Sequence, residues 1–282
     1  MSAARWFGDL GRSALLIGLL LTSGVATAAT QAGEVLLVTG SATATSPQGS
    51  VRELAKGDAL YSGEILNSGP NSYLNVRFTD GGFTLLRPNT RFVIEDYAFQ
   101  ADPSVIEAAQ AAAHTQPTPT PKPAVTPTPA PRPSVAIAPT PAPQQSTVAR
   151  SFFRLVKGGF RSITGLVGKI NRDEYKVATP VATIGIRGTD ITVIDCDLVC
   201  AEDPVIQEAL HSLPPGTTAL GATILIVNSG EAYITNALTG ETTIASAGMI
   251  VLSLPNGIQI VLGEMPGFLL IDPPPPPDQC LS

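Results

Sequence analysis

Short runs of apolar residues, separated by glycine-containing turns, recur along most of this 282-residue chain. At residues 73–78 the apolar side chains alternate, so that Leu74, Val76 and Phe78 share one face, as in a half-buried strand. Between residues 224 and 262, glycines separate short apolar runs at intervals of about ten residues. The pattern predicts an all-β fold of short, stacked or solenoid-like strands, with a β-sandwich as the alternative.

A Pro-Thr-Ala tract at residues 116–143 interrupts this pattern. Its backbone favours polyproline II and its side chains cannot form a core, so we expect a disordered, Pro-rich insertion. A helix that begins at Asp102 and Pro103 is expected to precede the tract. A second short helix is expected from Asp203 and Pro204 to Leu210, because Asp caps helices well and Pro suits the first helical position.

Changes in composition divide the chain into seven segments. They are 1–28, a signal peptide; 33–99 and 150–195, the two halves of one split domain; 100–149, an insertion made of a helix and an Ala/Pro/Thr-rich linker; 196–221, a Cys-containing loop with a short helix; 222–265, a C-terminal β continuation; and 266–282, a Pro-rich tail.

Residues 1–28 have the order of a secretory signal. Arg5 and Arg12 precede the apolar run 15–21, and Ala26 and Ala28 fit a signal peptidase site. A retained membrane anchor is the alternative, although the apolar run is shorter than the roughly 20 residues a spanning helix needs. We therefore expect a periplasmic, cell-surface or secreted protein with no stable membrane span after cleavage.

Export makes a disulfide between Cys196 and Cys200 the expected state of these two cysteines. Structural zinc would need two more ligands nearby, and the two histidines, His114 and His211, fall in the linker and on the second predicted helix. Cys280, near the C-terminus, is either free or available for an intermolecular bond. We expect no bound metal.

The formal charge of −6 and the isoelectric point near 4.9 argue against nucleic acid as a partner. An acidic cluster, whose members are Asp195, Asp197, Glu202 and Asp203, is interpreted as surface charge plus a helix cap, with a calcium site as the alternative. The cluster lacks the regular alternation and central glycine of a known calcium loop.

The sequence contains no pattern typical of an enzyme. There is no Gly-x-Ser-x-Gly elbow, no glycine loop ending in lysine, and no histidine near a plausible nucleophile. We therefore expect no catalytic residues and no cofactor.

Two segments carry specific residue patterns. The first is residues 57–90, which include the turn Asp80-Gly81-Gly82. The second is residues 177–190, which end in Arg187-Gly188-Thr189 followed by Asp190. Together they resemble the FecR domain of bacterial envelope proteins, and the second segment is similar to that family's "TP-A-x-x-G-x-RGT" signature followed by an acidic residue. The signature residues, structural or partner-binding, are Asp80, Gly81, Gly185, Arg187, Gly188, Thr189 and Asp190.

Within the signature, we expect Gly185 and Gly188 to let strands approach or bend, and Arg187 to form a charge-assisted pair with Asp190, three residues further on. Recognition of a partner by Arg187 is the alternative.

The best-known members of the FecR family combine a cytoplasmic anti-sigma segment, one membrane span and a periplasmic domain. Only a few residues lie between the signal peptide and the domain here, so this chain is more similar to stand-alone exported members. The resemblance implies a non-catalytic interaction or sensing module of the cell envelope, whose partner is an unidentified envelope protein or polymer. A small envelope hydrolase or carbohydrate-binding protein is the alternative.

Overall fold

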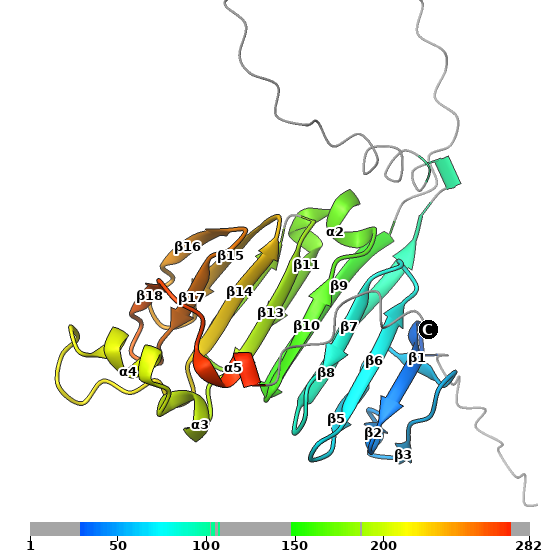
Figure 1. The fold of residues 1–282 in the computed structure, drawn as a ribbon. Helices are drawn as coiled ribbons and strands as arrows, with labels where there is room; N and C mark the ends of the chain where they lie inside the picture. The colour runs from blue at the N-terminus through cyan, green and yellow to red at the C-terminus, as the bar shows by residue number, and fades with distance from the viewer. Residues whose placement is uncertain (1–28, 102, 105–106, 108–147, 187, 272–282) are drawn as a thin grey trace, which may run out of the picture.

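The computed structural model describes residues 29–101, 103–104, 107, 148–186 and 188–271. Two nine-stranded sheets dominate the fold (Figure 1). Sheet I contains, in spatial order, β4 (Ala59–Tyr61), β1 (Gln31–Thr39), β6 (Tyr73–Phe78), β7 (Phe83–Leu86), β10 (Gly159–Ile163), β13 (Asp190–Asp195), β14 (Thr223–Ser229), β17 (Ile250–Ser253) and β18 (Gln259–Leu262). Sheet II contains β3 (Val51–Glu53), β2 (Ala42–Thr45), β5 (Ile65–Ser68), β8 (Arg91–Gln100), β9 (Val148–Lys157), β11 (Tyr175–Ala178), β12 (Ala182–Ile186), β15 (Glu231–Asn236) and β16 (Thr242–Ser246).

The chain passes back and forth between the two sheets and adds strands to both in nearly sequential order. Neighbouring strands pair antiparallel, except that β11 runs parallel to β9. The predicted all-β fold of short, stacked strands is therefore confirmed. The short helical segments are α2 (Val167–Ile170), the 3-10 turn η1 (Arg172–Glu174), α3 (Leu198–Ala201), α4 (Pro204–Leu210) and α5 (Gly267–Ile271).

The main core lies between the sheets and contains a row of contacting aromatic rings. Phe153 of β9 contacts Phe78 and Phe92 at ring-centre distances of 4.9 and 5.3 Å. Phe92 in turn contacts Phe160, across the stack in sheet I, at 5.1 Å. These rings come from both sheets and from both sides of the insertion, so they join the two halves of the predicted split domain in one core.

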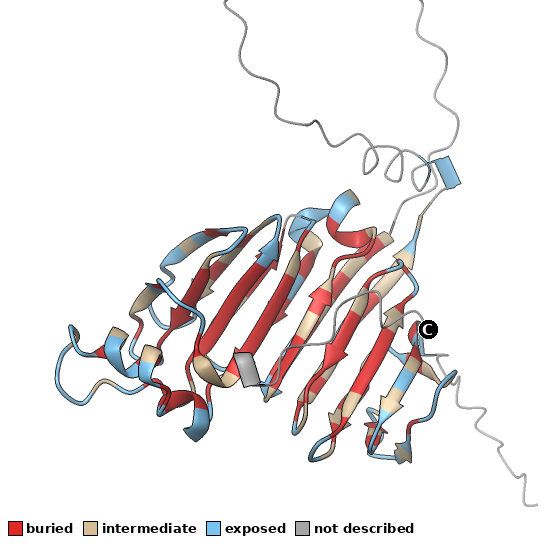
Figure 2. Ribbon diagram, in the orientation of Figure 1, coloured by how far each residue is buried: buried red, intermediate tan, exposed pale blue. Residues whose placement is uncertain are grey.

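A second apolar cluster covers the outer face of sheet I towards its C-terminal end. Strands β13, β14 and β17 are buried on both faces there, as the red ribbons in Figure 2 show. The segment between β13 and β14, which carries α3 and α4, folds over this outer face together with α5. Ile206 and Leu210 of α4 supply its apolar contacts to the sheet.

The insertion leaves the stack at the end of a long antiparallel hairpin. Strands β8 and β9 stay paired up to Gln100 and Val148. The described residues do not include the Pro-rich tract, most of the predicted helix at Asp102, the predicted signal peptide or Cys280.

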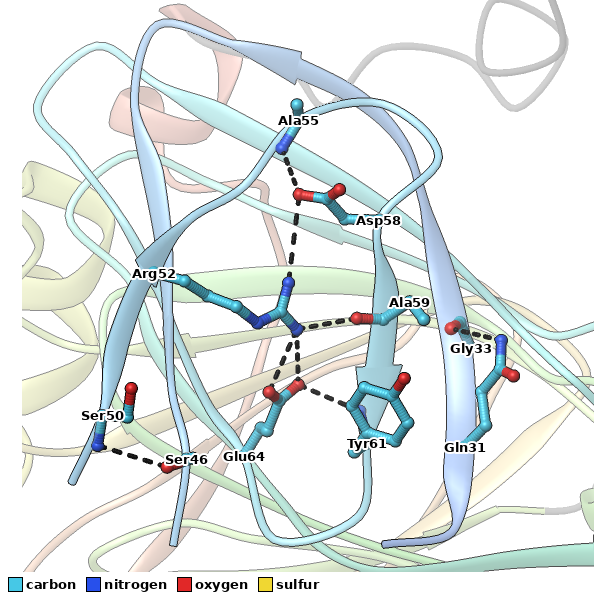
Figure 3. A network of polar contacts seen from close by, with 10 residues as sticks. All are labelled: Gln31, Gly33, Ser46, Ser50, Arg52, Ala55, Asp58, Ala59, Tyr61 and Glu64. Carbon is cyan, nitrogen blue, oxygen red and sulfur yellow. Dashed lines mark hydrogen bonds and ion pairs between the residues drawn. The ribbon is translucent and has the colours of Figure 1, made fainter. Parts of the chain in front are cut away.

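The N-terminal end of the stack is closed by a polar network around Arg52 of β3 (Figure 3). The Nη2 of Arg52 donates to both the buried Glu64 carboxylate, at 3.0 Å, and the carbonyl oxygen of Ala59, at 2.7 Å. The same Glu64 carboxylate accepts a hydrogen bond from the N–H of Tyr61, at 2.9 Å. Two main-chain groups of the edge strand β4 are thus bound by side chains.

Candidate functional site

The first half of the predicted signature forms a buried junction. The Asp80 carboxylate accepts hydrogen bonds from the N–H groups of Gly82 and Val167, both at 3.0 Å. The N–H of Asp80 donates to the hydroxyl of Tyr97, at 2.9 Å. Gly81 has a φ of 82°, which a residue with a side chain rarely adopts. Asp80 and Gly81 therefore shape the β6–β7 turn and anchor α2 to it.

Gly185 leaves room for an aromatic side chain that packs over it. A Cβ atom at Gly185 would lie 1.9 Å from the ring of Tyr233 on the neighbouring strand β15. Gly188 has a φ of 68°, and Thr189, which follows it, pairs through its main chain with Thr164. These three signature residues position strands β12 and β13.

Asp190 is bound by a residue that the sequence did not single out as its partner. The Nε of Arg161 on β10 donates to the Asp190 carboxylate at 2.9 Å, and a second guanidinium nitrogen binds the other oxygen. The Asn228 amide also donates to Asp190, at 3.0 Å. Arg187 lies outside the described residues, so its pairing with Asp190 and its role in binding stay predictions.

The predicted disulfide between Cys196 and Cys200 is confirmed, and both cysteines are buried in the second apolar cluster. Asp197 and Asp203 of the acidic cluster cap helices: their carboxylates accept hydrogen bonds from the N–H groups of Cys200 and Val205. The second oxygen of Asp203 accepts from the N–H of Phe268, which ties α5 to α4. The helix-cap interpretation of these two acids is confirmed.

A groove of about 580 Å³ lies between α4 and the edge strand β18. Its lining is mostly apolar and consists of Pro204, Val205, Glu208, Ala209, Ser212, Ile260, Val261, Leu262, Gly263 and Glu264. The helix forms one wall, and β18, the last strand of sheet I, forms the other. An apolar groove beside an edge strand suits an extended polypeptide, because the strand offers main-chain hydrogen bonds and the wall offers contacts for side chains.

A smaller cavity, of about 220 Å³, lies between the C-terminal end of β7 and α3. It is lined in part by Arg87, Asp195 and Asp197. Burial, and secondarily the neighbouring charge of Asp197, raise the pKa of the Asp195 carboxyl above its ordinary value.

The groove residues were not identified from the sequence, although the helix was. The cap pattern placed α4 correctly, from Pro204 to Leu210. Val205 and Ala209 form a wall of the groove only because α4 lies beside β18, which begins at Gln259. In the sequence, Val261 lies within the continuous apolar run Ile260-Val261-Leu262, so its 53% exposure could not be read from a two-residue alternation.

Comparisons with known proteins assign no family to this chain. No protein-family model and no curated protein matches the sequence. Two crystal structures of a putative anti-sigma factor from Parabacteroides distasonis match 71% of this chain and 59% of theirs, at 12% and 11% identity and a TM-score of 0.37. A structure described as a cell surface anchoring domain matches 22% of this chain and 82% of its own, at 26% identity and a TM-score of 0.22.

This chain thus spans about three-fifths of the length of the two anti-sigma factor structures. TM-scores this low assign neither a family nor a function, so the resemblance to the FecR domain stays a prediction. Across the described part of the chain, no helix combines the length and apolar character needed to cross a membrane.

Proposed function

We propose that this protein is an exported, non-catalytic module of the FecR type that binds a partner in the cell envelope through the groove between α4 and β18. The observation that carries the proposal is the groove itself: a mostly apolar surface beside an edge strand, at one end of a stack whose other end is closed by side chains. The disulfide Cys196–Cys200, which forms in oxidising compartments, supports the expected export.

The polar side chains of the groove favour binding over catalysis. They are those of Glu208, Ser212 and Glu264. Glu208 lies 3.0 Å from the ring of His211, but both side chains are largely exposed on the surface of the molecule. A general acid or base usually acts from a partly buried position, where its pKa is adjusted to the reaction. The proposed role is therefore recognition or sensing, and the partner is an envelope protein.

Site-specific photo-crosslinking tests this role. A photo-reactive phenylalanine analogue replaces Val205 in the groove, and in a matched control it replaces Val51 on β3, at the opposite end of the stack. Both proteins are exported, irradiated in intact cells and purified under denaturing conditions. We expect a discrete, light-dependent adduct with one envelope protein from position 205 and none of the same mass from position 51. Identical adducts at both positions, or none at position 205, would contradict the proposal.

A further inference from the structure

We propose that the partner binds as an extended segment that adds a strand to the free edge of β18, and that this segment carries basic side chains. This inference rests on the proposed function and specifies how the groove is used. It makes the partner segment the next strand of sheet I, with α4 packed along one side of it.

The hydrogen-bond phase of the β17–β18 hairpin shows which main-chain groups face the groove. The N–H of Leu254 donates to the carbonyl of Ile258 at 2.8 Å and closes the hairpin. Bonded pairs alternate in an antiparallel ladder, so Leu252 and Ile260 form the next bonded pair along the strands. The N–H and C=O of Val261 therefore point away from β17, towards the open edge.

These outward groups of Val261 have no hydrogen-bond partner among the described residues. Within that same part of the chain, β18 has one neighbouring strand, β17. Exposed edges of this kind are templates for pairing with another chain, and proteins usually block them.

The opposite edge of sheet I shows such a block. At β4 the outward carbonyl of Ala59 is bound by Arg52, and the outward N–H of Tyr61 is bound by Glu64 (Figure 3). The two edge strands of sheet I thus differ. Side chains bind the outward main-chain groups of β4, whereas the edge of β18 is open beside an apolar groove. This contrast is the main reason to assign strand addition to β18.

The charge of the groove indicates the chemistry of the partner. Its lining contains two carboxylates, Glu208 and Glu264, and neither Lys nor Arg. Alternate side chains of an added strand would point to the face where α4 lies, with apolar ones packing on Val205 and Ala209. We therefore expect a segment in which apolar residues alternate with others and Lys or Arg lies near one or both carboxylates.

Selection from a phage-displayed library of random peptides tests the inference on the purified full-length exported protein. Peptides are selected on the unmodified protein and counter-selected on the Val261→Pro variant. Proline removes the outward N–H of this edge position, but the bonds to β17 come from Ile260 and Leu262, so the strand should remain paired. We expect enriched peptides with alternating apolar residues and at least one Lys or Arg.

Individual peptides are then measured by fluorescence polarisation. We expect Val261→Pro to weaken binding at least tenfold, and the matched control Val261→Thr, which keeps the N–H, to change it less than threefold. Glu208→Gln combined with Glu264→Gln should weaken binding several-fold at low salt and less at high salt. If Val261→Pro proves unstable, Ala209→Arg, which fills the groove with a long basic side chain, should abolish binding instead.

Three results would overturn strand addition: no enrichment above the counter-selection, enrichment of acidic peptides, or equal binding by the proline and threonine variants. The photo-crosslink from position 205 separates these outcomes from failure of the proposed function. An adduct that persists in the Val261→Pro protein means that the groove binds its partner by side-chain contacts alone, so the function stands and strand addition fails. Loss of the adduct in Val261→Pro but not in Val261→Thr supports both.

Discussion

Arg161 and Asp190 join β10 to β13 on the outer face of sheet I. Their side chains are 17% and 13% exposed, so this pair is far less hydrated than the ion pair of Arg154 and Glu95 on β8 and β9, at 47% and 34%. The sequence motif drew attention to Asp190 and to its near neighbour Arg187, whereas the partner that the fold supplies comes from 29 residues earlier.

Replacing Arg161 tests how much this pair contributes to the free energy of unfolding. Arg161→Ala leaves the poorly hydrated Asp190 carboxylate with Asn228 and without its cation, and we expect the free energy of unfolding to fall by about 2 kcal/mol. The exposed counterpart, Arg154→Ala, should change it by no more than about 0.5 kcal/mol. Chemical denaturation of both variants measures the difference. Equal effects would show that burial does not strengthen the Arg161 pair.

The raised pKa of Asp195 predicts that ionisation of this carboxyl lowers the stability of the folded protein, whereas ionisation of most carboxyls raises it. Its pKa is raised in the folded protein, chiefly by burial, above the ordinary value of 3.8. The folded state then binds more protons than the unfolded state, so this group lowers stability as pH rises from about 3.8 through its folded pKa. We expect Asp195→Asn to raise the melting temperature at pH 7, with a gain that shrinks as the pH approaches 4. A gain that is unchanged at low pH would mean that ionisation of Asp195 is not the cause.

At the scale of elements, two long connections leave the stack, one between the paired strands β8 and β9 and one between β13 and β14. The insertion leaves and re-enters at the last paired residues of β8 and β9, Gln100 and Val148. The helical segment leaves and re-enters β13 and β14 next to the pair Asp195 and Thr223. A β-hairpin tolerates a long connection because loop-closure entropy grows only slowly with length.

Replacing residues 116–143 with a short Gly-Ser loop should therefore leave the stack intact. We expect the melting temperature to change by no more than about 3 °C, since the ladder between β8 and β9 supplies the pairing on its own. Differential scanning calorimetry makes the measurement, with the unshortened protein as reference. A large drop would show that the Pro-rich tract packs on the folded domain.

At the scale of the whole molecule, a row of aromatic rings joins strands of both sheets, and we expect the stack to unfold as a single cooperative unit. Phe153 is 2% exposed and contacts rings on strands from before and after the insertion, Phe78, Phe92 and Tyr175 among them. Its neighbour Phe152 points outward, with the Lys176 ammonium 5.6 Å from its ring centre. Adjacent phenylalanines thus lie on opposite faces of one strand.

This pair of neighbours gives a matched test of cooperativity. Phe153→Ala should lower the free energy of unfolding by about 4 kcal/mol, whereas Phe152→Ala should lower it by no more than about 1 kcal/mol. Because the core is continuous, Phe153→Ala should speed amide hydrogen exchange in β6 and in β14 alike. Faster exchange in β6 alone would show that the C-terminal strands fold independently.

Local patterns in the sequence determined much of this protein. Alternation at Leu74, Val76 and Phe78 predicted a strand and its buried face, because the two-residue period of a strand is a property of the backbone. Asp203 followed by Pro204 predicted the start of α4, because capping depends on a few neighbouring atoms. The Cys196–Cys200 disulfide was predicted from the expected export of the chain, because disulfides persist in oxidising compartments.

Only the tertiary structure decided which distant residues meet. The Arg161–Asp190 pair, the closure of β4 by Arg52 and the groove beside Val261 each bring together segments whose relative positions depend on the register and order of strands in the two sheets. Register is fixed by packing of the whole inner face, and no short stretch of sequence contains that information. The candidate binding edge arises in the same way: β18 is an edge because no further strand follows it in the described stack, and α4 flanks it because Ile206 and Leu210 are buried against the outer face of sheet I.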